Sequence, residues 1–351
     1  MNLLNHKCNT AQTRFNKINI RTTNKQIYKS QFVIWSKNSN FVFQAIKITH
    51  QLTDQMKEKI QLALLTFALK AIAIWPYCVL YFLSDLIYPL IYYIIRYRRK
   101  VVHSNLVNSF PEKSEKEIIE IEKKFYRHFC DYVMETIKIM HVSDDEMRKR
   151  MRFTNSEVIE ELRGDGRPFF VYLGHQGNWE YITSISLWVD SSLSGCQIYH
   201  PLSDKVMDQL IYRLRNRFNT VGIPQKNALR GILTMMKEGK QPLLGLIADQ
   251  RPQRYPEPEW TTFLNQETPI ITGGETLGRR LDAHFIYGSV KCIRRGYYEI
   301  TLHQIAPAED EPFSYSKEYM RMLEKDIRQQ PHMWLWSHKR WSIQKKDYIK
   351  S

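Results

Sequence analysis

Residues 169–180, FFVYLGHQGNWE, decide the fold class of this 351-residue chain. The first five residues form a short apolar run that is typical of a strand, and a helical stretch is predicted near residues 180–190. The turn between them is therefore a strand-to-helix junction. Because ligands bind at the carboxyl edge of an open α/β sheet, we expect a functional site in this turn.

Strand-like and helical stretches alternate on the carboxyl side of this segment. The predicted strands cover residues 197–199, 243–247, 284–287 and 298–302, and the predicted helices cover residues 204–219, 227–238, 273–281 and 315–329. Such alternation predicts an α/β sheet with helices on its faces. On the amino side, a capping-box pattern at Ser114 and Glu117 precedes apolar residues at three- and four-residue steps, which predicts one long helix over 114–140.

Two apolar runs lie nearer the N-terminus. Residues 62–83 contain one charge, Lys70, and as a helix they would cover about 33 Å, enough to span a bilayer. Residues 86–95 are too few to span, but their tyrosines suit a headgroup interface, and the basic sequence RYRRK at 96–100 follows. This basic stop places the rest of the chain on the cytoplasmic side. The alternative is a buried helical hairpin in a soluble core.

The composition is strongly basic, with a formal net charge of +15. Residues 1–55 hold eight Lys and Arg against a single acid, Asp54, and we interpret them as a poorly ordered extension or as a start upstream of the real one, with a basic binding arm as the alternative. A basic surface favours acidic partners, and the chain carries no nucleic-acid-binding motif. The five cysteines are scattered and support neither a disulfide framework nor a structural zinc site.

His175 and Glu180, five residues apart in the turn, are the first candidate catalytic residues. Histidine titrates near neutrality and is therefore suited to general-base chemistry, while a carboxylate beside it can fix its tautomer and stabilise the imidazolium. The chain has no Gly-x-Ser-x-Gly elbow, so direct attack by an activated substrate hydroxyl is the simplest scheme. The alternative is a structural histidine at a strand end.

Several short motifs accompany this turn in a fixed order. They are GHQGNWE (174–180), YHP (199–201), RLRNR (213–217), ADQRP (248–252) and WLWSHKRW (334–341), with NLVNSFPE (105–112) upstream. This set resembles the lipid A late acyltransferases, the lauroyl and myristoyl transferases of Gram-negative bacteria, from about Leu62 to Trp341. The tryptophans of the last motif suit either a membrane interface or an aromatic core.

The resemblance implies a glycerol-phosphate-acyltransferase-like mixed sheet flanked by helices, behind an N-terminal membrane-anchoring segment. It implies transfer of a fatty acyl chain from acyl carrier protein to a hydroxyl of a lipid A precursor at the inner membrane. The dyad would be His175 and Glu180, and Arg215 and Asp249 would bind substrate or support the site. No metal or cofactor is implied beyond the acyl donor.

The expected organisation is a basic extension over 1–55, a membrane anchor of spanning or interfacial helices over 56–100, and a cytoplasmic acyltransferase domain over 101–351. Two other functions stay open at this point: an acyltransferase that acts on a lysophospholipid or another glycolipid, and a membrane-anchored basic binding protein without enzymatic activity. The first would share the dyad and the anchor, whereas the second would leave His175 and Glu180 without a role.

Overall fold

The computed structural model describes residues 56–254, 256–309 and 311–348. The expectation for residues 1–55 lies outside this part of the chain. The chain divides into two compact units, Met1–Ala63 and Leu64–Ser351. Of the first unit the structure describes residues 56–63, which are helical. The second unit contains the sheet and the candidate site.

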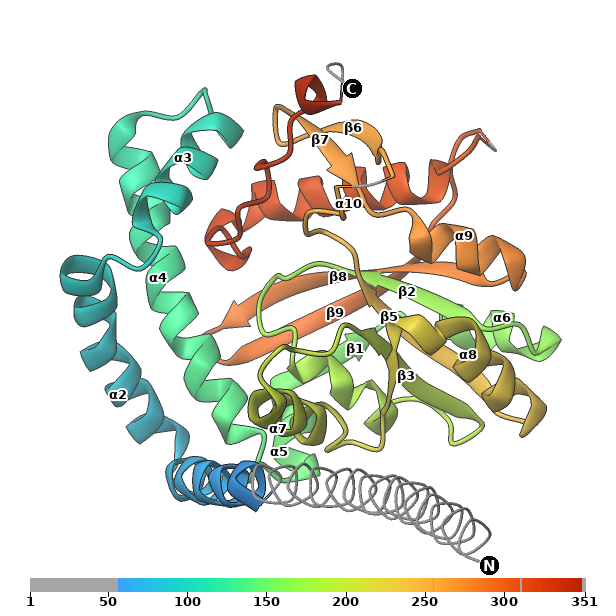
Figure 1. Ribbon diagram of the computed structural model, residues 1–351, viewed down its shortest axis with the longest axis horizontal. Helices are drawn as coiled ribbons and strands as arrows, with labels where there is room; N and C mark the ends of the chain where they lie inside the picture. Colours follow the sequence, from blue (N-terminus) through green and yellow to red (C-terminus); the bar gives the residue numbers. More distant parts are fainter. Residues whose placement is uncertain (1–55, 255, 310, 349–351) are drawn as a thin grey trace, which may run out of the picture. The chain divides into compact units, whose positions relative to one another are not determined.

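A mixed sheet organises the second unit (Figure 1), with its described strands in the order β1-β9-β8-β2-β5-β3-β4. Strands β8, β2, β5, β3 and β4 run parallel to one another, and β9 is antiparallel to β8. The strands are β1 Met151–Thr154, β2 Phe169–Leu173, β3 Leu193–Tyr199, β4 Val221–Pro224, β5 Gln241–Ile247, β8 His284–Arg294 and β9 Tyr297–Gln304. A separate hairpin pairs β6 Glu259–Phe263 with β7 Gln266–Ile270. The predicted α/β sheet is confirmed.

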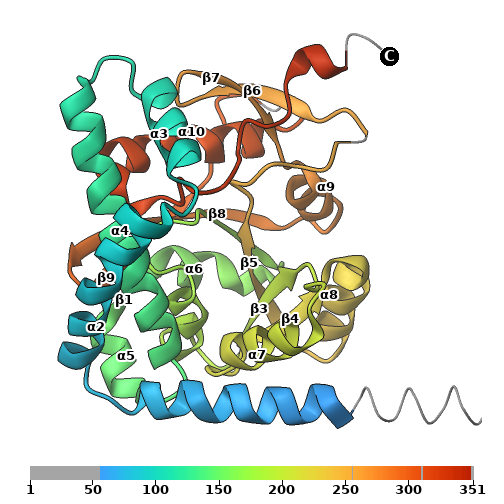
Figure 2. The same ribbon diagram turned by 60° about the vertical axis from the view of Figure 1, so that its left-hand side comes forward.

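Helices cover both faces of the sheet. The central strand β2 contributes Phe170 and Tyr172 to an apolar cluster that includes residues of α8 and α10. Its alternate residues, Phe169, Val171 and Leu173, belong to a second cluster that includes residues of α5, α6 and η3. Figure 2 shows α10 and α5 on opposite sides of the strands. Alternation of this kind is the period-two pattern of a strand buried on both faces. The helices named are α5 Asp144–Arg150, α6 Glu157–Leu162, η3 Tyr181–Leu187, α8 Ala228–Lys237 and α10 Ser314–Gln329.

The other predicted helices also form, as α4 Glu115–Lys138, α7 Lys205–Arg215 and α9 Gly273–Arg280. The capping box of α4 is present: the Ser114 hydroxyl accepts from the Glu117 backbone N–H, and the Glu117 side chain accepts from the Ser114 backbone N–H. The predicted helix near 180–190 is the 3-10 helix η3. The sequence did not indicate α3 Arg99–Ser109, α5, α6, β1, β4 or the hairpin, whose short segments carry too few periodic apolar residues.

The apolar segment near the N-terminus differs from the expectation, because residues 62–83 do not form one helix. In the second unit, the helix that includes residues 64–73 ends at a turn over 74–75, directly before Pro76, and α2 Tyr77–Pro89 continues into the π-helix η1 Leu90–Ile95. Proline has no backbone N–H and disfavours the helical conformation of the residue before it, so the helix ends there. Lys138 Nζ donates to the Ala73 and Trp75 carbonyl oxygens at 2.7 and 2.8 Å, which satisfies this helix end.

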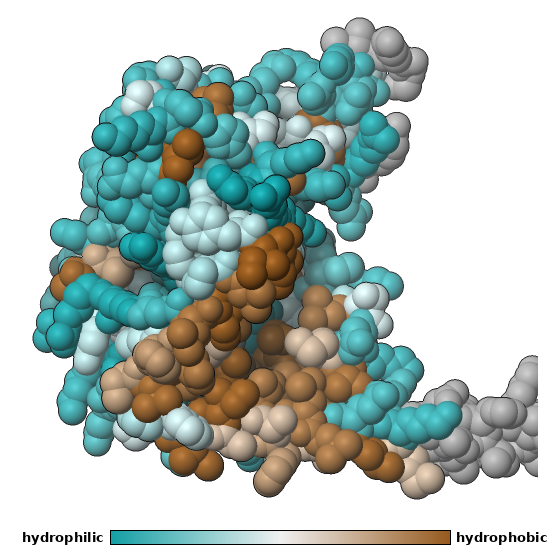
Figure 3. All heavy atoms as spheres, turned by 90° about the vertical axis from the view of Figure 1, so that its left-hand side faces the viewer, coloured by the Kyte–Doolittle hydropathy of each residue, from teal (hydrophilic) through white to brown (hydrophobic). Residues whose placement is uncertain are grey.

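The helix long and apolar enough to cross a membrane, among the described residues, is Tyr77–Ile95. Its inner side packs on α4 through Leu80, Ser84 and Tyr88, which are buried. Its outer side is exposed, with Phe82 and Ile94 at 62% and 74%. Figure 3 shows this side as a continuous hydrophobic band. The segment is therefore not a hairpin buried in the core of this chain.

Candidate active site

The pairing of β2 with β5 brings His175 and Asp249 together. The two strands are parallel, and their register pairs Leu173 with Ile247, so the residues two positions further on face each other. The backbone N–H of His175 donates to Asp249 Oδ2 at 2.8 Å, and His175 Nδ1 lies 2.6 Å from Oδ1. Both residues follow the carboxyl ends of their strands, where the sequence predicts the site.

Asp249 is a buried carboxylate that only accepts hydrogen bonds. Its side chain is 1% exposed, and a third donor, Trp334 Nε1, lies 2.7 Å from Oδ2. Burial acts to raise the pKa of Asp249, but His175 and these hydrogen bonds outweigh it and hold the pKa below the usual value. An ionised carboxylate needs a donor at Nδ1, so the proton of the neutral imidazole is on Nδ1 and the lone pair is on Nε2.

His175 Nε2 faces away from Asp249 and is available to substrate. The side chain of His175 is 17% exposed. Gln250 Nε2 lies 3.2 Å from His175 Nε2 and donates to its lone pair in this tautomer. A substrate hydroxyl that takes the place of the Gln250 amide would meet a base that is already oriented, which is the geometry general-base catalysis requires.

Glu180 and Arg215 form a second pair. Arg215 Nε and Nη2 donate to the two Glu180 carboxylate oxygens at 2.8 and 2.7 Å. Glu180 is buried, whereas the Arg215 side chain is 29% exposed. Two parallel hydrogen bonds fix the plane of the carboxylate. The imidazole thus has a carboxylate partner other than the one expected from the sequence, because strand pairing brings Asp249 to it while η3 directs Glu180 to α7.

The C-terminal segment around Trp334 completes the turn that carries His175. The Gly177 N–H donates to the Met333 carbonyl oxygen, and the Leu335 N–H donates to the His175 carbonyl oxygen, each at 3.0 Å. Trp334 is 2% exposed and Trp336 is fully buried, so these tryptophans belong to the core. The motif at 334–341 was recognised from the sequence, but the bond from Trp334 to Asp249 was not, because nothing local indicates it.

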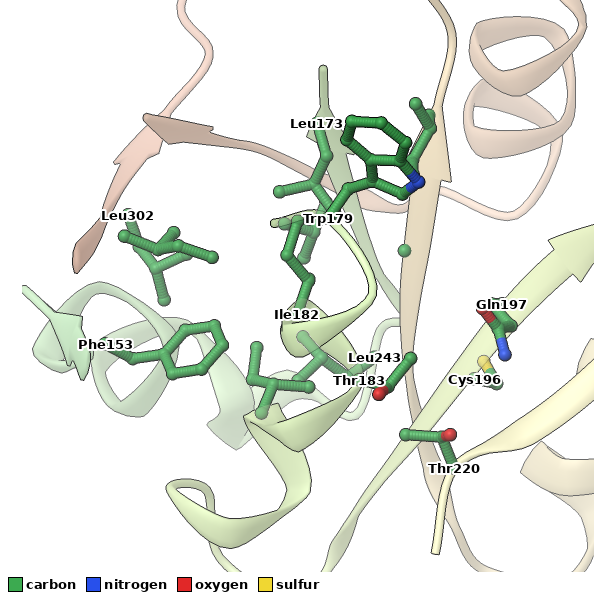
Figure 4. A pocket seen from close by; sticks show the side chains of 15 residues that line it. Phe153, Leu173, Trp179, Ile182, Thr183, Cys196, Gln197, Thr220, Leu243 and Leu302 are labelled. Carbon is green, nitrogen blue, oxygen red and sulfur yellow. The ribbon is translucent and has the colours of Figure 1, made fainter. Parts of the chain in front are cut away.

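An apolar pocket begins at Trp179, in the turn that carries His175 (Figure 4). The Trp179 ring stands edge-on to the imidazole with 5.1 Å between ring centroids, and Trp179 also lines the pocket. The walls come from β1, β2, β3, β5, β9 and η3, and include Phe153, Leu173, Ile182, Thr183, Cys196, Thr220, Leu243 and Leu302. Hydrocarbon side chains make up most of this lining, so the pocket suits a hydrocarbon chain. Within the described residues, no group of three His, Cys, Asp or Glu side chains is arranged to hold a metal ion.

The fold places the His175 imidazole and the Asp249 carboxylate at the carboxyl edge of a mixed sheet, next to an apolar pocket. The sequence model of the bacterial lipid A biosynthesis acyltransferases matches residues 51–343, a span that includes the sheet and every candidate site residue. The chain belongs to that family, as its motifs predicted, and the family supports an acyltransferase of lipid A biosynthesis. A comparison with curated proteins finds no match.

Proposed function

We propose that this protein transfers a fatty acyl chain from the thioester of acyl carrier protein to a hydroxyl of a lipid A precursor, at a late step of lipid A biosynthesis. The observation that carries the proposal is the His175–Asp249 pair beside the apolar pocket. The pair supplies the base that such a transfer needs, and the pocket supplies a place for the acyl chain.

The reaction follows from the orientation of the imidazole. His175 Nε2 takes the proton of the acceptor hydroxyl while the hydroxyl oxygen attacks the thioester carbonyl carbon. Asp249 stabilises the imidazolium that forms. The tetrahedral intermediate then collapses: the new C–O ester bond remains, the C–S bond breaks, and the thiolate of acyl carrier protein takes the proton from His175.

Glu180 and Arg215 support the site in this scheme. Glu180 is at the start of η3, whose residues Ile182 and Thr183 line the pocket. The Thr220 hydroxyl, which belongs to another wall residue, donates to the Arg215 backbone carbonyl oxygen. The ion pair therefore holds two walls of the pocket together. In this scheme the Glu180–Arg215 ion pair mainly positions the acyl chain, whereas Asp249 mainly assists proton transfer.

The exposed apolar side of α2 and η1 anchors the enzyme to the inner membrane in this proposal, with the catalytic domain on the cytoplasmic face. Exposed apolar area of this extent marks a membrane or protein contact. The exposed basic residues Arg96, Arg98 and Lys100 follow directly, where they would meet anionic headgroups. Because lipid A precursors are membrane lipids, the anchor would bring the site to its acceptor.

The test is transfer of radiolabelled acyl chain from acyl carrier protein to an under-acylated lipid A precursor by purified protein in detergent. We expect His175→Ala to lower turnover by roughly 10² to 10⁴-fold with unchanged thermal stability. A parallel assay offers a lysophospholipid as acceptor. Transfer to the lysophospholipid alone would favour the alternative acyltransferase, and near-normal turnover by His175→Ala would remove the proposed mechanism.

A further inference from the structure

We propose that Glu135, a buried carboxylate on α4, is a positioning residue that fixes the active-site turn through Asn178 and joins that turn to the membrane-facing helix α2. Nothing in the sequence marked Glu135, which is one of several acids on a long amphipathic helix. The proposal rests on the proposed function only for its kinetic readout.

Three donors from different parts of the chain converge on the Glu135 carboxylate. Asn178 Nδ2 donates to Oε2 at 2.9 Å, the Tyr298 hydroxyl donates to the same oxygen at 3.0 Å, and the Tyr81 hydroxyl donates to Oε1 at 2.9 Å. Glu135 is fully buried. Burial raises its pKa to about 7, while the three donors favour the ionised form. A buried carboxylate with this set of partners holds each of them in place.

The other end of the Asn178 side chain acts on the site itself. Asn178 Oδ1 accepts from the backbone N–H groups of Glu180 and Tyr181 at 3.2 and 3.3 Å. These N–H groups belong to the N-cap residue and to the first residue of η3, so Asn178 holds the start of the helix that follows Glu180 and forms one wall of the pocket. An Asn amide can rotate, and the bond from its nitrogen to Glu135 selects the orientation in which its oxygen holds the start of η3.

The same face of α4 contacts the turn at two further positions. His128 Nε2 lies 3.2 Å from the Gly177 carbonyl oxygen, and the Tyr132 ring stacks on Trp179 with 4.0 Å between centroids. Positions 128, 132 and 135 follow the four- and three-residue spacing of one helix face. This face therefore contacts three consecutive residues of the turn, and the Glu135 contact is the charged one.

The link to α2 comes from Tyr81, which belongs to the helix that can cross a membrane. The helices α2 and α4 lie side by side (Figures 1 and 2), and Arg295 joins Asp85 of α2 to Asp131 of α4 through ion pairs. The Glu135 carboxylate thus contacts both the apolar helix α2 and the turn that carries His175.

The test compares Glu135→Gln with Tyr298→Phe. Glutamine has one acceptor oxygen and no charge, so the bond from Asn178 loses its charge assistance even where that oxygen takes the place of Oε2. We expect kcat to fall by about 10- to 100-fold, as for a displaced catalytic group, with KM for both substrates within twofold. Tyr298→Phe removes one hydrogen bond to the same carboxylate and keeps the ring, so kcat should stay within threefold. Equal losses in the two variants would show a structural role and overturn the proposal.

A double variant sharpens the test. Glu135→Gln combined with Asn178→Asp exchanges donor and acceptor between the two side chains. The kcat of this double variant should therefore be at least tenfold higher than the kcat of either single variant. No recovery in folded protein would refute the pairing. Hydrogen exchange at the amides of Glu180 and Tyr181 supplies a readout without substrate: it should accelerate in Glu135→Gln and not in Tyr298→Phe. If wild type fails to acylate lipid A, the exchange result still decides this inference.

Discussion

The substitution Asp249→Asn separates the two carboxylates that could serve His175. Asparagine has nearly the same shape, but one of its two polar groups is a donor. If its oxygen takes the place of Oδ2, it still accepts from the His175 N–H and from Trp334, and its NH₂ group then faces Nδ1. The imidazole must then carry its proton on Nε2, which leaves no base directed at the substrate.

The magnitude follows from the loss of the bond between Asp249 and the imidazole. Without that bond no base is directed at the substrate, and general acid–base catalysis typically contributes roughly 10² to 10⁴-fold. A loss of about 3 to 6 kcal/mol in the transition state corresponds to roughly 10² to 10⁴-fold in kcat/KM. In contrast, Glu180→Gln keeps one strong bond to Arg215 and should cost about tenfold.

The assay measures acyl transfer from acyl carrier protein by both variants at equal thermal stability, in the same detergent. A further control is Trp334→Phe, which removes a single hydrogen bond to Asp249 and should fall between the two. If Glu180→Gln were more damaging than Asp249→Asn, the assignment of Asp249 as the partner of His175 would be refuted.

Three further outcomes are expected. Gly245 lines the pocket from β5, and a Cβ there would make only ordinary contacts. Gly245→Val should therefore fold and prefer donors with shorter acyl chains, because each methylene excluded from the pocket costs about 0.8 kcal/mol of binding. Transfer rates with donors of graded chain length measure this preference. Burial lowers the pKa of His128 to about 4, so the folded protein favours the neutral imidazole and becomes less stable as the pH falls below 6.5. Between pH 7.5 and 5 this effect lowers the free energy of unfolding by about 2 kcal/mol. His128→Gln should remove that part of the pH dependence, as measured by denaturant titration at the two pH values. Leu86 and Ile94 lie on the exposed side of α2 and η1. The double substitution Leu86→Ser and Ile94→Ser should weaken membrane association by about 1.5 to 3 kcal/mol per side chain without lowering the Tm. Unchanged flotation of the variant with lipid vesicles would contradict the proposal that this side anchors the protein.

The parts of this structure that could be predicted from the sequence depend on local patterns. The capping box at Ser114 and the run at 169–173 specify their elements through neighbouring residues, and both form as expected. The family motifs also brought Arg215 and Asp249 into the candidate site. Pro76 is a local signal as well, and it ends the helix that the apolar run predicts through residue 83.

The pairing within the site could not be predicted, because it depends on which strands are neighbours. His175 and Asp249 are 74 residues apart, and they meet because β5 lies beside β2 in a given register. The interpretation that Glu180 orients His175 relied on proximity in the sequence. Glu135 depends on contacts from three separate segments, so no local pattern could indicate its role.

The bond between Leu335 and His175 has a consequence for the order of biosynthesis. The turn that carries His175 follows β2 directly, but its partners Met333 and Leu335 lie about 160 residues further along the chain and are therefore translated much later. By then the helix Tyr77–Ile95, which is long and apolar enough to cross a membrane, has long been translated. Under the proposed anchoring, translation that stops before residue 333 would leave a membrane-bound protein whose His175 turn lacks these two partners.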